Sequence, residues 1–380
     1  MIFLKRILSN KRFQTTTILG AIFTFFLFLS IFSLRGFKKI NNREKSQFTP
    51  RYNKVLFNNT IICPHLDVKV TDNNNIVWCA TFQLAWNELC NLLGENAHFV
   101  NEPNYVEILN RKYISKDDLN ENDYVIASGL ANEEIINKIH NDINRKFGDK
   151  LEYNQNLTPK LSPIGVLFIF SFLFKELPFE WSFERLREPL IFENKKVESF
   201  GIDQFLTRQK NEVKAASQVL IYDFKDHNDF IIELKTKSQN DRLFLAKIKP
   251  ENTLSETIAA VLNRISNNQH KEFPRLSSLI IPVIYFDLER DFVDLCNKPL
   301  ITNNQLYNSK ELYIAQQKIT FKLDEKGAML KSNALMVSGI AEDYVFDKPF
   351  LVMILRNGSD KPYLALWISN DELLIPFRDK

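Results

Sequence analysis

The sequence has few of the residues that build nucleotide or metal sites. Its 380 residues include ten glycines, four cysteines and five histidines. No G-x-G-x-x-G, Walker or G-x-S-x-G pattern occurs, which argues against a glycine-rich phosphate cradle and a nucleophile elbow. Cys63, Cys79, Cys90 and Cys296 show no C-x-x-C spacing, and the histidines are scattered singly. We therefore expect buried free thiols, no metal and no cofactor.

An excess of charge of one sign is also missing. The 49 Lys and Arg residues and 46 Asp and Glu residues leave a formal charge of +3. This balance gives no whole-chain attraction for nucleic acid, and we predict no such partner. No nucleophile, base and orienting group come together along the chain, so we do not predict an enzyme. Hydrophobic residues make up 45 % of the chain, enough for one large domain or two small ones.

One long hydrophobic run stands near the N-terminus. Residues Ile18–Leu34, ILGAIFTFFLFLSIFSL, carry no charge, and Thr15–Thr17 extend the run to the ~20 residues that a transmembrane helix needs. A secretory signal has a shorter core of roughly 7–15 residues and a small-x-small cleavage site, which SLRGFKK does not supply. The segment has no polar face that would suit a buried core helix. An uncleaved anchor is favoured over a cleaved signal peptide.

The anchor divides the chain into four parts. We predict a short basic tail at 1–17, the anchor at 18–34, a basic tether at 35–58 and a folded body at 59–380. Four basic residues precede the span and five follow it, so the positive-inside rule does not decide the orientation. On the function inferred below, we expect a single-pass membrane protein whose body lies on the extracytoplasmic side.

The first part of the body has helical periodicity. Residues 75–94 place Phe82, Trp86 and Leu89 at helical spacing before a glycine, and residues 132–148 carry a stripe of isoleucines. Thr253-Leu-Ser-Glu256 has the spacing of a capping box. The spacing of Leu288, Phe292 and Leu295 predicts one further short helix.

The rest of the body favours strands, several of them separated by turn-length gaps that predict hairpins. Helices early and strands late indicate an α+β domain with largely antiparallel sheets. The candidate strands are Val166–Phe174, Phe230–Lys237, Arg242–Lys249, Leu279–Tyr285, Lys318–Leu323, Phe350–Leu355 and Tyr363–Ile368.

The last third of the chain has a distinctive order. The strand KITFKL runs into DEKG and a long stretch without a clear element pattern, and FDKPFLVMILRNGSDKPYLALWISN follows. This order resembles the end of the serpins, in which a strand leads through an acidic hinge into an exposed bait loop and the chain returns as a strand and a hairpin. The residues that match the hinge are Asp324, Glu325 and Gly327, and those that match the return are Phe346, Pro349 and Phe350.

Other stretches resemble the same family. GVLFIFSFLFKELPFEWSF at 165–183 is similar to the central strand of the main serpin sheet, with Phe174 and Lys175 matching the family's Phe-Lys pair. DFIIELKTKSQNDRLFLAKIKPE resembles a pair of strands, and EFPRLSSLIIPVIYFDLERDFVDL a strand followed by a helix. The resemblance covers roughly residues 160–370. The family's tryptophan after the Phe-Lys pair is displaced: Pro178 and Phe179 occupy its place and Trp181 follows. The region 95–160 is too short for every family helix, so we expect a trimmed serpin-like fold.

The resemblance implies a metastable protein whose loop, once cleaved, inserts into the main sheet as a new strand. Residues of an inserted strand alternate between core and solvent. The positions that would face the core are Ala328, Leu330, Ser332 and Ala334, which are small or apolar, whereas Met329, Lys331 and Asn333 would face outward. The stretch from Gly327 is thus predicted to be a spare strand, held outside a sheet that has room for it.

The resemblance also sets the partner. It implies a serine protease, or alternatively a cysteine protease, and a monomeric inhibitor. The bond between Ala341 and Glu342 is the first candidate for cleavage within the range 335–342, and a small residue before the cut suits an elastase-like or subtilisin-like enzyme. Leu330 and Lys331 interrupt the run of small residues typical of inhibitory serpins. A non-inhibitory binding or structural protein with the serpin fold is therefore the alternative.

Overall fold

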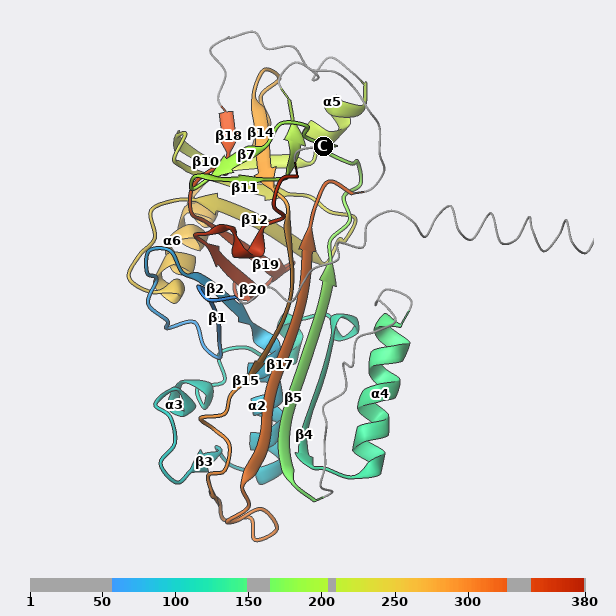
Figure 1. Ribbon diagram of the computed structural model, residues 1–380, viewed down its shortest axis with the longest axis vertical. Coiled ribbons are helices and arrows are strands. Elements are labelled where there is room, and N and C mark those ends of the chain that lie inside the picture. The colour runs from blue at the N-terminus through green and yellow to red at the C-terminus, as the bar shows by residue number, and fades with distance from the viewer. Residues whose placement is uncertain (1–56, 149–164, 204–209, 327–342, 379–380) are drawn as a thin grey trace, which may run out of the picture. The chain divides into compact units, whose positions relative to one another are not determined.

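The computed structural model describes residues 57–148, 165–203, 210–326 and 343–378, which form three principal sheets (Figure 1). The main sheet has the strand order β15-β17-β5-β4, the small sheet β18-β14-β9-β6, and the large sheet β1-β2-β20-β19-β12-β11-β10-β13. The main sheet consists of β4 (Tyr124–Leu130), β5 (Leu167–Glu176), β15 (Ile284–Asp291) and β17 (Leu312–Leu323). The small sheet consists of β6 (Glu184–Arg185), β9 (Ser199–Ile202), β14 (Ser278–Pro282) and β18 (Asp343–Val345).

The remaining elements complete the body. The large sheet consists of β1 (Thr60–Cys63), β2 (Asn75–Cys79), β10 (Val219–Asp226), β11 (Asp229–Leu234), β12 (Asp241–Lys247), β13 (Lys271–Glu272), β19 (Phe350–Arg356) and β20 (Pro362–Ile368). Two short pairs are β3 (His98–Phe99) with β16 (Leu300–Ile301), and β7 (Leu190–Phe192) with β8 (Lys195–Val197). The helices are α2 (Ala80–Leu93), α3 (Tyr105–Leu109), α4 (Glu133–Phe147), α5 (Lys210–Ala216) and α6 (Leu254–Asn267), with 3-10 turns η1 (Lys116–Asp118), η2 (Glu121–Asp123) and η3 (Asp371–Leu373).

Local sequence signals set the predicted helices. The side chain of Asn132 accepts a hydrogen bond from Ile135 N at 2.8 Å and so caps α4. Thr253 and Glu256 form the predicted capping box at the start of α6, each side chain accepting from the other's backbone N–H at 3.2 Å. Helix α2 ends at Gly94, whose φ of 79° suits glycine.

Three predicted elements differ from the structure. Residues Asn75–Cys79 are strand β2 and not the first turn of a helix, because β1 and β20 pair with this β-branched segment on both sides. The predicted helix through Leu288 is wrong: Leu288 lies in β15, where buried and exposed side chains alternate. The predicted strand Leu279–Tyr285 is divided at Val283 between β14 of the small sheet and β15 of the main sheet.

The predicted hairpins are confirmed. Strand β11 pairs with β12 across the turn at 238–241, and β19 pairs with β20 across the turn at 357–362, both antiparallel. These four central strands are almost wholly buried, so the large sheet provides the main hydrophobic core. Gly201 lets β9 approach β14 closely, because a Cβ there would lie 1.7 Å from Leu279 O.

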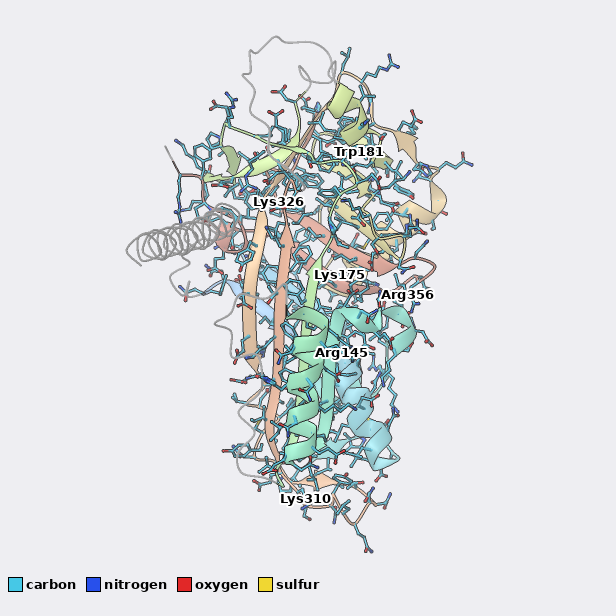
Figure 2. All side chains as sticks on the ribbon, turned by 90° about the vertical axis from the view of Figure 1, so that its right-hand side faces the viewer. Arg145, Lys175, Trp181, Lys310, Lys326 and Arg356 are labelled. Atoms are coloured by element: carbon cyan, nitrogen blue, oxygen red, sulfur yellow. The ribbon has the colours of Figure 1, made fainter. Side chains whose placement is uncertain are left out.

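The main sheet lies between two helices (Figures 1 and 2). Helix α2 covers one face, and its side chains form a cluster with those of β5 and β17. Helix α4 covers the other face of β4 and β5 through Ile139, Ile143 and Phe147. This arrangement buries both faces of β5, consistent with its nearly continuous apolar sequence.

Candidate functional site

The centre of the main sheet contains a parallel pair of strands. Strand β17 pairs with β5 in parallel over ten positions, from Leu312 and Leu167 to Lys322 and Glu176, and we call this ladder the seam. The outer pairs of the same sheet, β15 with β17 and β4 with β5, are antiparallel. The sequence predicts a sheet with room for a spare strand, and this expectation is wrong for the described state. A strand can enter only if the seam opens.

The face of the seam toward α2 carries polar groups in an apolar surrounding. Gln317 of β17 donates from Nε2 to Cys79 O at 3.0 Å and to Thr81 Oγ1 at 3.1 Å. Its register partner, Ser171 of β5, is fully buried. Within the described residues, Ser171 Oγ and Gln317 Oε1 have no hydrogen-bond partner. Each unmade hydrogen bond of this kind costs about 1–3 kcal/mol, which weakens the closed seam.

The other face of the seam is divided into an apolar and a polar half. On β5, every second residue is a buried phenylalanine under α4, and these are Phe168, Phe170, Phe172 and Phe174. On β17, the corresponding row begins with the apolar Ile314 and continues with polar residues that are bonded to acidic residues of β15. Lys318 Nζ lies 3.0 Å from Glu289, and Thr320 donates to Asp287 at 2.8 Å. An inserted strand would therefore have an apolar, covered neighbour on the β5 side of this face and a polar neighbour on the β17 side.

The predicted hinge begins where β17 ends. Asp324 accepts a hydrogen bond from Lys326 N at 3.0 Å and pairs with Lys322 at 2.8 Å. Glu325 pairs with Arg185 of β6, and Arg185 also pairs with Glu198. The Glu325 side chain is only 16 % exposed. Arg185 therefore fastens the upper end of the main sheet to the small sheet.

Lys175, predicted from the family's Phe-Lys pair, lies at the centre of a buried charge cluster at the upper end of β5 (Figure 2). Its ammonium pairs with Asp123 and, at 2.9 Å, with Asp241 of β12. It also lies 5.5 Å from the ring centre of Tyr363, whose hydroxyl donates to Asp241 at 2.6 Å. Phe174 packs beneath α4 against Phe147, with the two ring centres 5.8 Å apart and the rings tilted by 47°. The cluster ties the main sheet to the large sheet.

The environment of the cluster sets two pKa values. Burial by itself would raise the pKa of Asp241, but the Lys175 charge and hydrogen bonds from Ser238 and Tyr363 outweigh it, and the pKa is lowered. Burial, followed by the neighbouring Asp241 charge, raises the pKa of Tyr363 well above its ordinary value. At neutral pH, Asp241 is therefore a carboxylate and Tyr363 is a neutral hydrogen-bond donor to it.

The predicted return residues pack into the core. Phe346 is fully buried, and its ring centre lies 5.0 Å from that of Phe230 and 5.1 Å from that of Phe350. Pro349, which lies between Phe346 and Phe350 in the sequence, is half-buried. Lys247 holds this segment by donating to Val345 O at 2.9 Å and to Asp347 Oδ1 at 2.6 Å.

The remaining predicted site residues lie outside the described residues. These are the hinge and insertion positions Gly327, Ala328, Leu330, Ser332 and Ala334, and the candidate scissile pair Ala341 and Glu342. Sequence reasoning also missed four side chains that the structure brings to the site: Arg185, Gln317, Asp241 and Tyr363. A buried lysine in an apolar strand predicts that a carboxylate lies nearby, but it does not identify which one.

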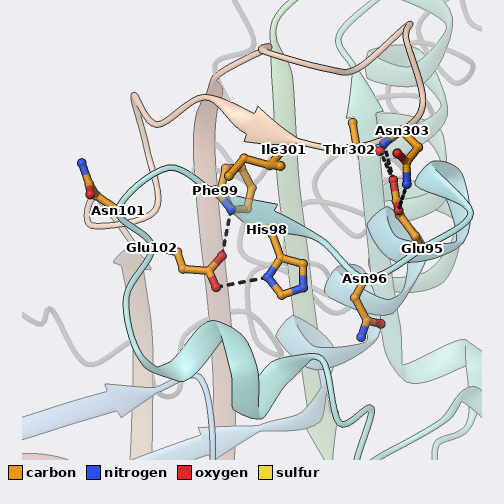
Figure 3. A pocket seen from close by; sticks show the side chains of 9 residues that line it. All are labelled: Glu95, Asn96, His98, Phe99, Asn101, Glu102, Ile301, Thr302 and Asn303. Carbon is orange, nitrogen blue, oxygen red and sulfur yellow. Dashed lines mark hydrogen bonds and ion pairs between the residues drawn. The ribbon is translucent and has the colours of Figure 1, made fainter.

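A cavity of about 720 Å³ at the lower end of the body lies apart from the seam (Figure 3). Its two carboxylates already hold the surrounding loops. Glu95 accepts from the side chain of Thr302 and from Asn303, which lowers its pKa. Glu102 accepts from Phe99 N at 2.8 Å and lies 3.1 Å from His98. Within the described ranges, no group of three potential metal ligands occurs.

No family model and no curated protein matches the chain. Comparison with solved structures finds thyroxine-binding globulin in complex with thyroxine at 15 % identity, covering 62 % of this chain and 64 % of that one, with a TM-score of 0.40. It also finds the Manduca sexta serine protease inhibitor serpin-12 at 10 % identity, 78 % and 99 % coverage and a TM-score of 0.46. Native protease nexin-1 with heparin is found at 11 % identity, 76 % and 97 % coverage and a TM-score of 0.43.

The fold is serpin-like. Because all three identities are low and all three TM-scores are below 0.5, this assignment depends on the strand order and on the chain path from β17 through residues 327–342 to β18 and the β19–β20 hairpin. The chain spans less than two thirds of the length of the thyroxine-binding globulin. Among the described residues between β4 and β5 there is one helix, α4, and residues 149–164 lie outside the described part of the chain, so the trimming before residue 160 stays a prediction.

The predicted membrane span at 18–34 and most of the tether lie outside the described residues. Among the helices from residue 57 onward that the structure describes, none combines the length and the apolar character needed to cross a bilayer.

Proposed function

We propose that this protein is a membrane-anchored, serpin-like protease inhibitor that acts by cleavage of the segment 327–342 and insertion of its N-terminal part into the seam. The observation that carries the proposal is the parallel pairing of β5 with β17 within an otherwise antiparallel sheet. The anchor at 18–34 and the extracytoplasmic position of the body belong to the same proposal.

The direction of the chain favours insertion at this place. Because the segment leaves from the upper end of β17, a strand that folds back into the sheet must run opposite to β17 and also opposite to β5. Insertion would exchange one parallel ladder for two antiparallel ladders, which are slightly more stable per residue and together hold about twice as many hydrogen bonds. Ser171 Oγ and Gln317 Oε1 have no hydrogen-bond partner in the described part of the chain, which makes the closed seam easier to open.

The length and polarity of the segment 327–342 are also compatible with insertion into the seam. The residues from Gly327 to Ala341 outnumber the ten paired positions of the seam. Small or apolar side chains at Ala328 and Ala334 suit the face toward α2. Lys331 and Asn333 would lie beside the polar row of β17, where acidic side chains of β15 are within reach.

The test of inhibition is whether the protein forms a covalent complex with a protease. Full-length protein in phosphatidylcholine nanodiscs is incubated with elastase, with subtilisin and with a cysteine protease of similar specificity. We expect a complex that survives a denaturing gel and peptide fragments that locate the cut near Ala341. Complete turnover of the segment by every protease, with no trapped species, would refute inhibition.

A second candidate is a non-inhibitory binding or structural protein with the same fold. It is favoured by the closed seam and by Leu330 and Lys331, which would slow the start of insertion in competition with hydrolysis. Cleavage followed by remelting separates the two: insertion should raise the unfolding temperature strongly. Ala334→Arg should abolish that rise, because it places a charge at a buried position, whereas Asn333→Arg at the neighbouring outward position should preserve it.

A further inference from the structure

One of the four tryptophans is kept on the surface. Trp78, Trp86 and Trp367 are at most 2 % exposed, whereas Trp181 is 40 % exposed. The chain around it is firmly placed, because the nearby aromatic residues Phe179 and Phe183 are buried, with ring centres 4.7 Å apart. Phe179 thus fills the buried aromatic position after Lys175, and the larger indole of Trp181 contacts solvent.

The indole is held in a defined position. The side chain of Gln218, itself 3 % exposed, accepts from Trp181 N at 3.2 Å and donates to Trp181 O. The ammonium of Lys214 on α5 lies 3.9 Å from the ring centre. An exposed tryptophan whose backbone is fixed loses little entropy on binding, and tryptophan is among the commonest hot-spot residues of protein interfaces.

The surroundings of Trp181 are basic. Lys235 N donates to Gln218 O and Lys237 N to Pro178 O, both at 2.8 Å, so these two segments lie beside the tryptophan loop. Lys235 and Lys237 are both exposed, and so is the acidic residue Glu180, which precedes Trp181 in the sequence. We call the group of Trp181, Lys214, Lys235 and Lys237 the Trp181 surface. Its charge is complementary to a carboxylate-rich partner.

The Trp181 surface lies at the end of the body from which the segment 327–342 leaves. Figure 2 shows Trp181 and Lys326 at the same, upper end, opposite Lys310. Arg185, four residues beyond Trp181, holds the hinge residue Glu325. We propose that the Trp181 surface is a second docking site for the protease, which contacts it through an acidic region while its active site takes the segment. This inference rests on the proposed function for the identity of the partner.

The experiment varies the charge of the protease at constant specificity. Pancreatic elastase is compared with the same enzyme after succinylation, which converts its surface lysines to carboxylates. The second-order rate constant for loss of intact full-length chain is measured at 50 mM salt for wild type, Trp181→Ala and Lys235→Glu/Lys237→Glu. The matched controls are Tyr313→Ala, at an exposed site on the lower part of β17, and Lys69→Glu/Lys138→Glu.

We expect the succinylated enzyme to consume wild type faster than the unmodified one. Each Trp181-surface variant should slow the succinylated enzyme about fivefold to tenfold, and the controls should stay within about twofold. Equal rates for all variants would overturn the proposal. The rate counts trapped and released protease alike, so absence of a covalent complex would refute the inhibitory function without affecting this test.

A fluorescence measurement tests the competing partner, a membrane surface. Because Trp181 is the exposed one of the four tryptophans, iodide quenching reports mainly on it. Quenching should be the same in phosphatidylcholine and phosphatidylserine nanodiscs and should fall when the succinylated, active-site-blocked elastase is added. Protection of Trp181 by phosphatidylserine alone would overturn the protease assignment in favour of the lipid surface.

Discussion

Replacing Lys175 by methionine removes the cation from the buried cluster that joins the main sheet to the large sheet. The side chains of Lys175 and Asp241 are 5 % and 3 % exposed and lie 2.9 Å apart. Methionine fills a similar volume, so the loss is mainly the uncompensated carboxylate. Breaking a buried pair from one side costs about 3–5 kcal/mol, and we expect Lys175→Met to lower the free energy of unfolding by this amount at pH 7.5.

The pH dependence of this loss has a definite sign. In the wild type, the pKa of Asp241 is lowered, so its contribution to stability is present above the ordinary value of about 3.9 and is lost as the pH falls through the lowered pKa. Without Lys175, we expect burial to outweigh the hydrogen bonds from Ser238 and Tyr363 and to raise the pKa of Asp241 above the ordinary value, so that protonation relieves the penalty. The difference in the free energy of unfolding between Lys175→Met and wild type should therefore become smaller from pH 7.5 to pH 5.

The assay is urea unfolding, followed by tryptophan fluorescence at several pH values. Wild type, Lys175→Met, Asp241→Asn and the double variant Lys175→Met/Asp241→Asn together form a double-mutant cycle. The double variant should cost no more than Lys175→Met alone, because it leaves no buried charge from this pair. A pH-independent difference, a loss below about 1 kcal/mol, or additive costs in the double variant would each show that the pair does not stabilise the junction as described.

Three further changes test other parts of the structure. Arg185→Met removes the shared partner of Glu325 and Glu198, and amide hydrogens at 324–326 should exchange at least tenfold faster, whereas unchanged exchange would mean that the ion pair does not hold the hinge. Ser171→Ala removes a buried hydroxyl without a described partner and should stabilise the closed protein by about 1 kcal/mol, measured by urea unfolding; a clear destabilisation would reveal a hydrogen bond at this site. Thr253→Ala removes the capping box of α6 and should cost about 1 kcal/mol, with Thr253→Ser close to wild type as the control; equal losses in both would attribute the effect to packing and not to the cap.

The features that could be predicted from the sequence are those encoded by neighbouring residues. The caps of α4 and α6, the glycine stop of α2 and the two hairpins of the large sheet all depend on residues within one turn of each other. Where a segment fits both the helical and the strand periodicity, pairing with neighbouring strands decides which of the two it forms. The helical spacing at 75–94 continues into Asn75–Cys79, yet β1 and β20 draw this segment into the large sheet. Leu288 likewise follows the alternation of β15.

The candidate site could be predicted only in part, because its chemistry depends on contacts between distant residues. Lys175 was identified by its resemblance to a family pair, but its partner Asp241 lies 66 residues away and belongs to another sheet. Arg185 is 140 residues from Glu325. The closed seam was also beyond the sequence, since nothing in β5 or β17 alone specifies that the two strands pair directly. Only the sheet topology shows that β5 and β17, which pair over ten positions, must separate before a strand can enter between them.

The parallel seam has a consequence for biosynthesis. When the ribosome has made β5, its partner on the side opposite β4 is still missing, and residues 177–311 must be added before β17 appears. At 5–20 residues per second this takes roughly 7–27 s. During that time the open edge of β5, whose one face carries four phenylalanines, is exposed to pairing with a strand from another nascent chain. We therefore expect faster translation between these two strands to shorten the time for which this edge is open to pairing with another chain.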